Sequence, residues 1–241
     1  MKHAGDMKQL LRFLKWVARV GGDDESLYRG QGSTEWPLLP ALARVTPRSS
    51  LTLDEQAMVG ELRRHLPQLS VPTPSNDWDL LALARHHGLA TRLMDWTRNP
   101  LAALFFAIEK PADSNCAPAA VWCVTPKKAE VVVRFGQEDP FQQVKTRFFM
   151  PRIMSPRMQT QNGWFSVHAP KRRSEKFKAM QDDRQFRSRL HTYRIPPELF
   201  SPLRYALDHV GVNRASLFPD LDGLCGYITW ANTKEPDEIH L

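Results

Sequence analysis

Residues 87–97 read His-Gly-Leu-Ala-Thr-Arg-Leu-Met-Asp-Trp-Thr. This stretch places polar side chains where a packed core calls for apolar ones, so we expect it to serve chemistry or binding. A helical pattern from Asn76 to His86 precedes it, with Gly88 as the stop signal, and Asn99-Pro100 opens an apolar run that ends at Ile108. The sequence therefore predicts that these polar residues lie at a corner between two helices.

The length and composition of the chain predict one globular domain. Its 241 residues are 42% hydrophobic, which is enough for a sizeable core. We expect a single domain over residues 1–241, with an N-terminal helix in residues 1–25 and a basic, irregular segment at residues 142–189. The first twenty residues carry six charged side chains, and no apolar run reaches membrane-spanning length. We therefore expect a cytoplasmic protein without a membrane partner.

The cysteines and the paired histidines do not predict a metal site. Cys116, Cys123 and Cys225 have neither C-x-x-C spacing nor an even number, which argues against zinc and against a disulfide framework. We expect them in the core or in strands. His86 and His87 have no carboxylate or cysteine at ligand spacing, so a general base is a stronger role for this pair than a metal ligand.

The order of patterns along the chain predicts helices in its first half and strands in its second. Asp6 caps an amphipathic helix, and Thr52 with Glu55 forms the capping box of another. We expect strands at residues 26–29, 120–124, 130–135, 190–195 and 225–230, and a further helix at residues 197–210. This order predicts an α+β fold in which a helical N-terminal half packs on a mostly antiparallel sheet.

Positive charge is concentrated in residues 142–194. This segment holds thirteen Lys or Arg and three acidic residues, a local balance of +10 in a chain whose net charge is +7. Aromatic residues are interleaved with the cations, which is typical of surfaces that follow a phosphate backbone and stack single-stranded bases. A surface for an acidic protein partner and a plain solvated face are the alternatives. The expected nucleic-acid contacts are Arg152, Arg157, Trp164, Lys171, Arg172 and Arg173.

Four short motifs occur in the order found in FRG-domain proteins. They are Tyr28-Arg29-Gly30-Gln31, residues 86–97, Gln161-Asn162-Gly163-Trp164-Phe165, and the Leu-Phe-Pro-Asp-Leu-Asp-Gly-Leu run at residues 217–224. The chain resembles this family over residues 26–230. It departs from the usual pattern where Arg85 and His87 replace Gln and Tyr, Ala90 replaces Pro, and Met94 replaces Leu. The Arg92, Asp95, Trp96 and Thr97 positions are unaffected.

Tyr28-Arg29-Gly30 also resembles the first motif of the arginine-serine-glutamate class of ADP-ribosyltransferases, in which that arginine holds NAD. Ser166 directly follows the motif at residues 161–165 and stands in the position of the superfamily's hydroxyl residue. Asp220 or Asp222 stands in the position of its acidic residue, although the usual glutamate is absent. The resemblance implies a split sheet, NAD as co-substrate without a metal, and catalytic roles for Arg29, Ser166 and Asp220 or Asp222.

The residue types fit this chemistry. A guanidinium offers a planar pair of donors to a diphosphate, and Gly30 would let a phosphate approach the backbone. A carboxylate would stabilise the positive charge that builds on the ribose when nicotinamide leaves. Three structural alternatives remain: an ion pair between Arg29 and Asp95, a helix clamp made by Arg92 and Asp95, and an Asx turn at residues 220–222. The expected NAD-binding residues are Tyr28, Arg29, Gly30, Gln31, His86, Thr91, Arg92, Asp95, Trp96 and Thr97.

Two classes of function follow. The first is an NAD-consuming transferase that modifies nucleic acid or protein. The resemblance implies that it is the toxin of a bacterial toxin–antitoxin or phage-defence system, with an antitoxin protein as partner. The second is a non-catalytic module that binds a nucleotide or a protein in the same cleft. An enzyme of the first class should gather Arg29, Ser166 and an aspartate around one cavity, whereas a binding module need not.

Overall fold

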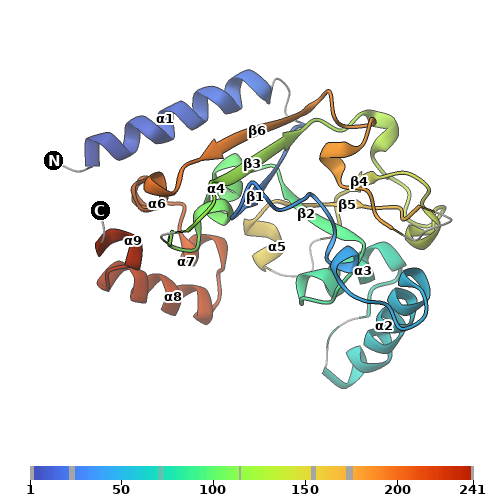
Figure 1. Ribbon diagram of the computed structural model, residues 1–241. Coiled ribbons are helices and arrows are strands. Elements are labelled where there is room, and N and C mark those ends of the chain that lie inside the picture. Colours follow the sequence, from blue (N-terminus) through green and yellow to red (C-terminus); the bar gives the residue numbers. More distant parts are fainter. Residues whose placement is uncertain are drawn as a thin grey trace.

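The computed structural model describes residues 3–21, 25–69, 71, 73–113, 115–152, 156–171 and 176–239. Within these residues six strands form one open sheet in the order β4-β5-β2-β1-β3-β6, and all neighbouring strands are antiparallel (Figure 1). The predicted α+β class with an antiparallel sheet is therefore confirmed. The strands are β1 (Leu27–Gln31), β2 (Leu93–Thr97), β3 (Ala119–Val124), β4 (Arg147–Phe149), β5 (Gly163–Val167) and β6 (Leu190–Ile195).

The sheet consists of two halves that meet at a narrow junction. β1 pairs with β3 over residues 27–31, and β2 pairs with β5 over residues 93–97. Between β1 and β2, by contrast, the only residue pair in the described register is Tyr28 with Thr97. The strands β1, β3 and β6 thus form one half, the strands β2, β5 and β4 form the other, and the halves diverge beyond this pair.

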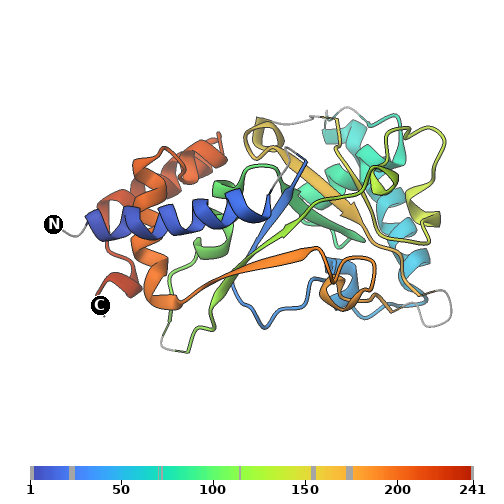
Figure 2. The same cartoon turned by 90° about the horizontal axis from the view of Figure 1, so that it is seen from above.

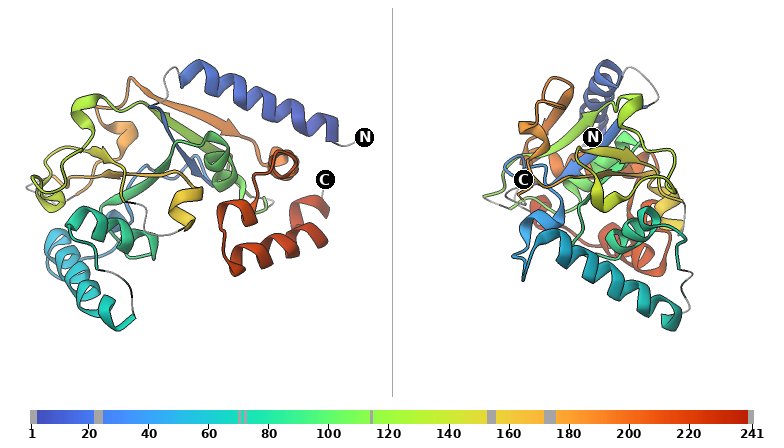
Figure 3. Two further views of the ribbon diagram at one scale, coloured as in Figure 1. Left: turned by 180° about the vertical axis from the view of Figure 1, so that it is seen from behind. Right: turned by 90° about the vertical axis from the view of Figure 1, so that its right-hand side faces the viewer.

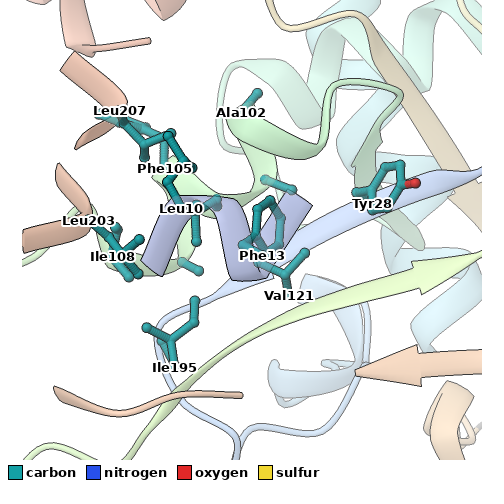
Figure 4. Close-up of a cluster of buried hydrophobic side chains, with 14 of the residues drawn as sticks. Leu10, Phe13, Tyr28, Ala102, Phe105, Ile108, Val121, Ile195, Leu203 and Leu207 are labelled. Carbon is teal, nitrogen blue, oxygen red and sulfur yellow. The ribbon is translucent and has the colours of Figure 1, made fainter. Parts of the chain in front are cut away.

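Helices α1 (His3–Val20), α4 (Pro100–Ile108) and α6 (Phe200–His209) cover the β1-β3-β6 half. Gly30 explains the close contact of α4 with β1. A Cβ atom at this position would lie 2.1 Å from the Ala103 carbonyl oxygen and 2.6 Å from the Ala107 nitrogen. Figure 4 shows the resulting core, in which α1, α4, α6 and the strands contribute Leu10, Phe13, Tyr28, Phe105, Ile108, Val121, Ile195, Leu203 and Leu207.

Helices α2 (Leu51–His65) and α3 (Asp77–His86) pack against the β2-β5-β4 half. Trp78 of α3 is fully buried, and its ring contacts Phe149 at 4.9 Å between ring centroids. The remaining cluster of buried residues joins Met94, Trp96 and Phe148 to Phe186. Successive residues of β2 therefore enter different apolar clusters, with Leu93 in the α3 cluster and Met94 in the other.

Local capping signals account for several helix starts. Asn76 accepts a hydrogen bond from the Asp79 nitrogen at the start of α3, and Asn99 accepts from Leu101 and Ala102 at the start of α4. Both starts were predicted. The predicted capping box at Thr52 is wrong, because Ser50 caps α2. The predicted cap at Asp6 is also wrong, because α1 already includes His3.

Three other predicted elements are corrected. Residues 93–97 form β2, so the polar stretch is a strand between α3 and α4 and not a helix–helix corner. Residues 225–230 lie in helix α8 (Leu221–Asn232), which makes Cys225 an exposed helical residue. Residues 130–135 form a single bridge, Val131 with Phe148, in place of a strand. In addition, β4 and β5 both lie inside the segment 142–189 that was expected to be irregular.

The short helices α5 (Pro156–Thr160), α7 (Arg214–Leu217) and α9 (Pro236–Ile239) complete the fold with α8. Figures 1 and 2 show α8 and α9 at the same end of the molecule as the start of α1. Figure 3 shows α2 and α3 at the opposite end. No helix among the described residues has the length and apolar character needed to cross a membrane.

Candidate functional site

A cleft of about 430 Å³ opens where β1 and β2 diverge. Its position follows from the narrow junction of the sheet, because strands that stop pairing leave space between their side chains. Both halves of the sheet and several helices contribute to its wall. The wall includes Tyr28, Arg29, Gly30, Arg85, His86, Asp95, Trp96, Thr97, Phe106, Gln161, Trp164 and Phe218.

Two arginines and one aspartate form the polar centre of the cleft. Arg85 of α3 donates from Nε and Nη2 to Asp95 Oδ2, at 3.1 and 2.6 Å. Arg29 of β1 donates from Nη1 to the Asp95 carbonyl oxygen at 2.7 Å and lies 3.5 Å from Asp95 Oδ2. The guanidinium of Arg29 thus bridges the two strands where their backbone pairing has ended. The Asp95 side chain remains 46% exposed and is accessible from the cleft.

The environment of these groups shifts their pKa values. Desolvation by the surrounding protein would raise the pKa of Asp95, but attraction to Arg85 and Arg29 outweighs it, so the pKa is lowered. Burial lowers the pKa of Arg29, although Asp95 opposes this shift and the neighbouring Arg85 adds to it. Asp95 is therefore an ionised carboxylate held between two cations.

Aromatic rings flank this polar centre. The guanidinium of Arg98 lies over the Trp164 ring at 4.9 Å from its centroid, and Phe106 of α4 contacts Phe218 edge-to-face at 5.9 Å. Two buried donors, Arg29 Nε and Trp164 Nε1, have no hydrogen-bond acceptor among the residues that the structure describes. The cleft thus combines cations with flat apolar surfaces.

Seven of the residues predicted to bind NAD line this cleft: Tyr28, Arg29, Gly30, His86, Asp95, Trp96 and Thr97. The Gly30 backbone reaches the cleft wall, but the absent side chain makes room for α4. Burial raises the pKa of Tyr28 to about 12. Thr97 donates from Oγ1 to the Gln161 carbonyl oxygen at 2.6 Å, which ties β2 to the motif before β5.

The other three predicted NAD-binding residues lie away from the cleft, each with a structural partner. Arg92 is fully buried and pairs with Glu55 of α2 at 2.6 Å, so it clamps α2 to β2. The Gln31 side chain accepts a hydrogen bond from the Trp122 indole at 2.6 Å. Thr91 is fully buried, and its hydroxyl accepts from the Leu93 nitrogen.

Ser166 is buried in β5 and does not line the cleft. Its hydroxyl accepts a hydrogen bond from the Trp96 indole at 2.8 Å and lies 2.8 Å from His168 Nε2. Burial, together with the charge of Arg29, lowers the pKa of His168 to about 3, so the imidazole is neutral, and its Nε2 shares a hydrogen bond with the Ser166 hydroxyl. This chain of hydrogen bonds holds the indole of Trp96 in the cleft wall.

Asp220 and Asp222 are exposed and do not line the cleft. Asp220 caps α8 by accepting from the Gly223 nitrogen at 2.7 Å, as expected from the turn alternative. Gly223 cannot carry a side chain, because a Cβ atom there would lie 1.9 Å from the Phe218 carbonyl oxygen. From this motif it is Phe218 that reaches the cleft.

Most of the aromatic side chains of the basic segment are not available for stacking on bases, contrary to the prediction from the sequence. Phe148, Phe149, Phe165 and Phe186 are buried, so these rings pack in the core and offer no stacking surface. Among the predicted contacts, Arg152 and Lys171 are exposed and Trp164 is in the cleft wall. Arg152 Nε lies 3.6 Å from Asp79 Oδ2. Arg172, Arg173 and the side chain of Arg157 lie outside the described residues.

Sequence reasoning missed Arg85 as a site residue. It occupies the second-last position of an ordinary helix, so its local pattern carries no signal of a site. The available signal was its departure from the family pattern, since an arginine there replaces a neutral Gln. No cluster of three metal-ligating side chains occurs in the described part of the chain.

Comparison with known proteins bears on the first half of the chain. The family model for the FRG domain matches residues 24–116. The matched region contains β1, α3 and β2, and therefore Arg29, Arg85 and Asp95. No curated protein and no solved structure matches the chain significantly. The similarity to the FRG domain is therefore shown for residues 24–116.

Proposed function

We propose that the cleft binds NAD and that the protein transfers ADP-ribose from it. The observation that carries this proposal is the convergence of Arg29 and Arg85 on Asp95 in a cleft flanked by aromatic rings. Two cations suit a diphosphate, and flat apolar walls suit the adenine and nicotinamide rings. A ligand with both features is a dinucleotide.

The diphosphate binds to Arg29 and Arg85. Both guanidinium groups are anchored by Asp95, and both arginines line the cleft. Planar guanidinium groups form paired hydrogen bonds with phosphate. Lysine at either position provides a point charge without this geometry.

Asp95 is the carboxylate that stabilises the reacting ribose. In the reaction the bond from the ribose C1 to the nicotinamide nitrogen breaks, and nicotinamide leaves with the electron pair. An acceptor nucleophile then bonds to C1 and gives up its proton. The sugar carries positive charge between these events, and an ionised carboxylate beside it lowers its energy. Asp95 is ionised and lines the cleft, whereas Asp220 and Asp222 do not line it.

The single residue pair between β1 and β2 supports the split sheet that the resemblance implies. Among the described residues, strand pairing is continuous within each half of the sheet, whereas the two halves are joined by the single pair of Tyr28 with Thr97. Nucleic acid is the proposed acceptor, supported by the local charge of +10 in residues 142–194. The proposed setting is cytoplasmic, as a toxin in a toxin–antitoxin or phage-defence system.

A binding module without catalysis is the second candidate. It is favoured by the burial of Ser166, which leaves the cleft without the hydroxyl group expected of the transferase class. Such a module would use Arg29, Arg85 and the aromatic walls to hold a nucleotide. A transferase with a protein acceptor is a further form of the first candidate.

The test is to incubate the purified protein with radiolabelled NAD and total cell extract, then measure label in RNA, DNA and protein separately. Calorimetry measures NAD binding in parallel. Arg29→Ala and Arg85→Ala should lose NAD affinity, and Arg29→Lys should not restore it. Asp95→Asn should slow nicotinamide release by about 100-fold or more, the usual cost of losing a charge-stabilising group.

The double variant Asp220→Asn, Asp222→Asn is the matched control and should transfer label at the wild-type rate. Loss of transfer in this variant with full activity in Asp95→Asn would reverse the assignment of the carboxylate. Tight NAD binding without nicotinamide release supports the binding module. Failure of the wild-type protein to bind NAD contradicts the proposal as a whole.

A further inference from the structure

Helix α1 packs on the rest of the molecule through one of its sides. Leu10, Phe13 and Trp16 belong to the core cluster on that side. Figure 1 shows α1 at the top of the molecule, and Figure 2, which is seen from above, shows it in front of the sheet. The opposite side of the helix is therefore an outer surface of the protein.

This outer side of α1 carries two parallel rows of exposed side chains. One row is apolar and consists of Met7, Leu11, Leu14 and Ala18. The other row is cationic and consists of Lys8, Arg12, Lys15 and Arg19. Within each row the residues are separated by four, three and four positions, a spacing that keeps side chains in line along a helix. The two rows together are called the α1 face below.

The apolar row has the pattern of a contact between two helices. Met7, Leu11 and Leu14 are 37%, 52% and 38% exposed. Isolated apolar residues are common on protein surfaces and need no explanation. A row with spacings of three and four positions is different, because it forms the seam along which paired helices pack. The α1 face thus presents one half of such a seam.

The cationic row carries positive charge that its surroundings do not balance. Residues 7–20 contain no Asp or Glu. Among the described residues no carboxylate forms an ion pair with any of the four cations, and Arg12 donates a hydrogen bond to the neutral side chain of Gln9 at 3.2 Å. An exposed row of one sign attracts groups of the opposite sign. The row therefore selects for an acidic partner.

The two rows act on the same occupant because they border one depression. This depression has a volume of about 360 Å³ and is lined by Met7, Lys8, Leu11, Arg12 and Lys15. A molecule that lies in it contacts apolar carbon and positive charge at once. An amphipathic helix with acidic residues along the edge of its apolar seam offers both complements.

Other occupants match the α1 face less well. A second copy of the chain would bring together two sets of four cations, with only Asp6 of each α1 to offset them. Helices that lie in a membrane surface insert aromatic residues into the lipid, whereas Phe13 and Trp16 of α1 are packed in the core. Nucleic acid would pair with the cations but gain nothing from the apolar row.

We propose that the α1 face is a docking site for an amphipathic helix of an acidic protein partner. The apolar residues of that helix pack against Met7, Leu11 and Leu14, and its Asp or Glu residues pair with the cationic row. This docking site does not depend on the proposed NAD binding, because the α1 face and the cleft share no lining residue.

The experiment measures binding of a synthetic helical peptide to the full-length protein by fluorescence anisotropy. The Glu peptide has about three heptads, with Leu at the a and d positions and Glu at the flanking e and g positions. The Lys peptide has Lys in place of each Glu, and a scrambled peptide keeps the composition of the Glu peptide without its spacing. The Glu peptide should bind, more weakly as the salt concentration rises, and the other two should bind about tenfold more weakly or less.

Charge reversal on the protein should exchange the preference between the peptides. The double variant Lys8→Glu, Lys15→Glu should bind the Glu peptide about tenfold more weakly than wild type and should bind the Lys peptide more tightly than wild type does. These side chains point away from the core, so thermal unfolding and NAD affinity should be unchanged.

A neutral substitution tests the apolar row. Leu11→Gln should weaken binding of the Glu peptide about fivefold, because half of the Leu11 side chain is available for burial. Leu53→Gln is the matched control, since it makes the same change at a leucine of α2 that is 61% exposed, and it should bind the peptide like wild type.

Three results would overturn the proposal. If the Glu peptide fails to bind at low salt, or binds no better than the scrambled peptide, the α1 face does not recognise a helix. If vesicles of equal parts phosphatidylcholine and phosphatidylserine bind wild type, lose binding in Leu11→Gln, and the Glu peptide does not bind, the surface is for a membrane. If sedimentation shows a wild-type dimer that Leu11→Gln dissociates, the occupant is a second copy.

Discussion

Single residues in β2 decide which groups face the ligand and which hold the wall in place. Asp95 is accessible from the cleft, whereas Trp96 is buried and supported from behind by Ser166 and His168. Ser166, which sequence order suggested as a catalytic hydroxyl, has its hydrogen bonds committed to this support. His168 bonds to Ser166, and its lowered pKa should make the stability of the folded protein depend on pH.

We predict that His168 makes the protein less stable in mild acid. The pKa of His168 is about 3 in the folded protein, against an ordinary value of 6.5. Below about pH 6.5 the imidazole is therefore protonated in the unfolded chain but stays neutral in the folded protein, which favours unfolding. The stabilising contribution is complete above the ordinary pKa and is lost as the pH falls toward 3. Between about pH 7 and pH 5, wild type should lose about 2 kcal/mol more unfolding free energy than His168→Gln.

Urea denaturation at the two pH values measures this difference. His191→Gln is the control, because His191 is exposed on β6 and its variant should keep the wild-type pH dependence. An identical loss of stability in wild type and His168→Gln would show that His168 is protonated in the folded protein.

At the scale of elements, the start of α8 illustrates how a capping residue resembles a catalytic one in sequence. Asp220 and Asp222 lie in the motif that reaches the cleft through Phe218, yet neither carboxylate lines it. Asp220 satisfies a free backbone N–H group at the helix start.

We therefore predict that Asp220→Ala destabilises the protein by about 1 kcal/mol, the usual value of an N-cap, without changing ligand affinity in the cleft. Asp222→Ala should cost less, because Asp222 makes no hydrogen bond or ion pair with the described residues and contributes through the helix dipole from the first turn. Urea denaturation and calorimetric titration of the same samples separate stability from binding. A loss of NAD affinity at unchanged stability in Asp220→Ala would contradict this prediction.

A second prediction at this scale concerns the contact of α4 with β1. Gly30→Ala places a methyl group against the α4 backbone, which cannot move without disturbing the core, so we expect a loss of about 3 kcal/mol or more. Gly60→Ala in α2 is the matched substitution. No atom lies within 4 Å of its added Cβ, and alanine favours helix, so this variant should gain about 0.5 to 1 kcal/mol. Thermal and urea unfolding compare the two, and equal stabilities would refute the packing argument.

The whole molecule combines a cleft between two half-sheets with a basic segment that contributes strands to one of them. Phe148, Phe149, Phe165 and Phe186 of that segment are buried, so the attraction to nucleic acid that we expect rests mainly on its cations. Trp164 belongs to the cleft wall, so its replacement should affect NAD binding and not nucleic-acid binding.

We predict that the protein binds single-stranded RNA or DNA with an affinity that falls steeply with salt concentration. Replacing Lys171, Arg172 and Arg173 together by Ala should reduce the slope of log affinity against log salt by about 2 to 3 units. Trp164→Ala is the control and should leave that slope unchanged. Fluorescence anisotropy at several salt concentrations measures both. Absence of binding at low salt, with an acidic protein copurifying on this segment, would favour the docking alternative.

The sequence by itself predicted the α+β class and the starts of α3 and α4, and it offered the contact of Arg29 with Asp95 as one alternative. Helix starts are predictable because Asn76 and Asn99-Pro100 act on backbone groups within three residues of themselves. The motif order predicted that Arg29, residues 91–97 and Asp220–Asp222 meet in one cleft. Arg29 and residues 95–97 do line it, whereas Asp220 and Asp222 do not.

Only the tertiary structure decided which polar residues face the cleft. β2 is buried on both faces, so its sequence lacks the alternation that marks a strand. Arg85 lies in the last turn of α3, and Arg92 directly precedes β2. One turns toward Asp95, and the other inserts beside Glu55, which lies 37 positions earlier in the chain. Their roles depend on partners that are distant in sequence, and a buried cation is stable only where such a carboxylate is brought to it by the fold.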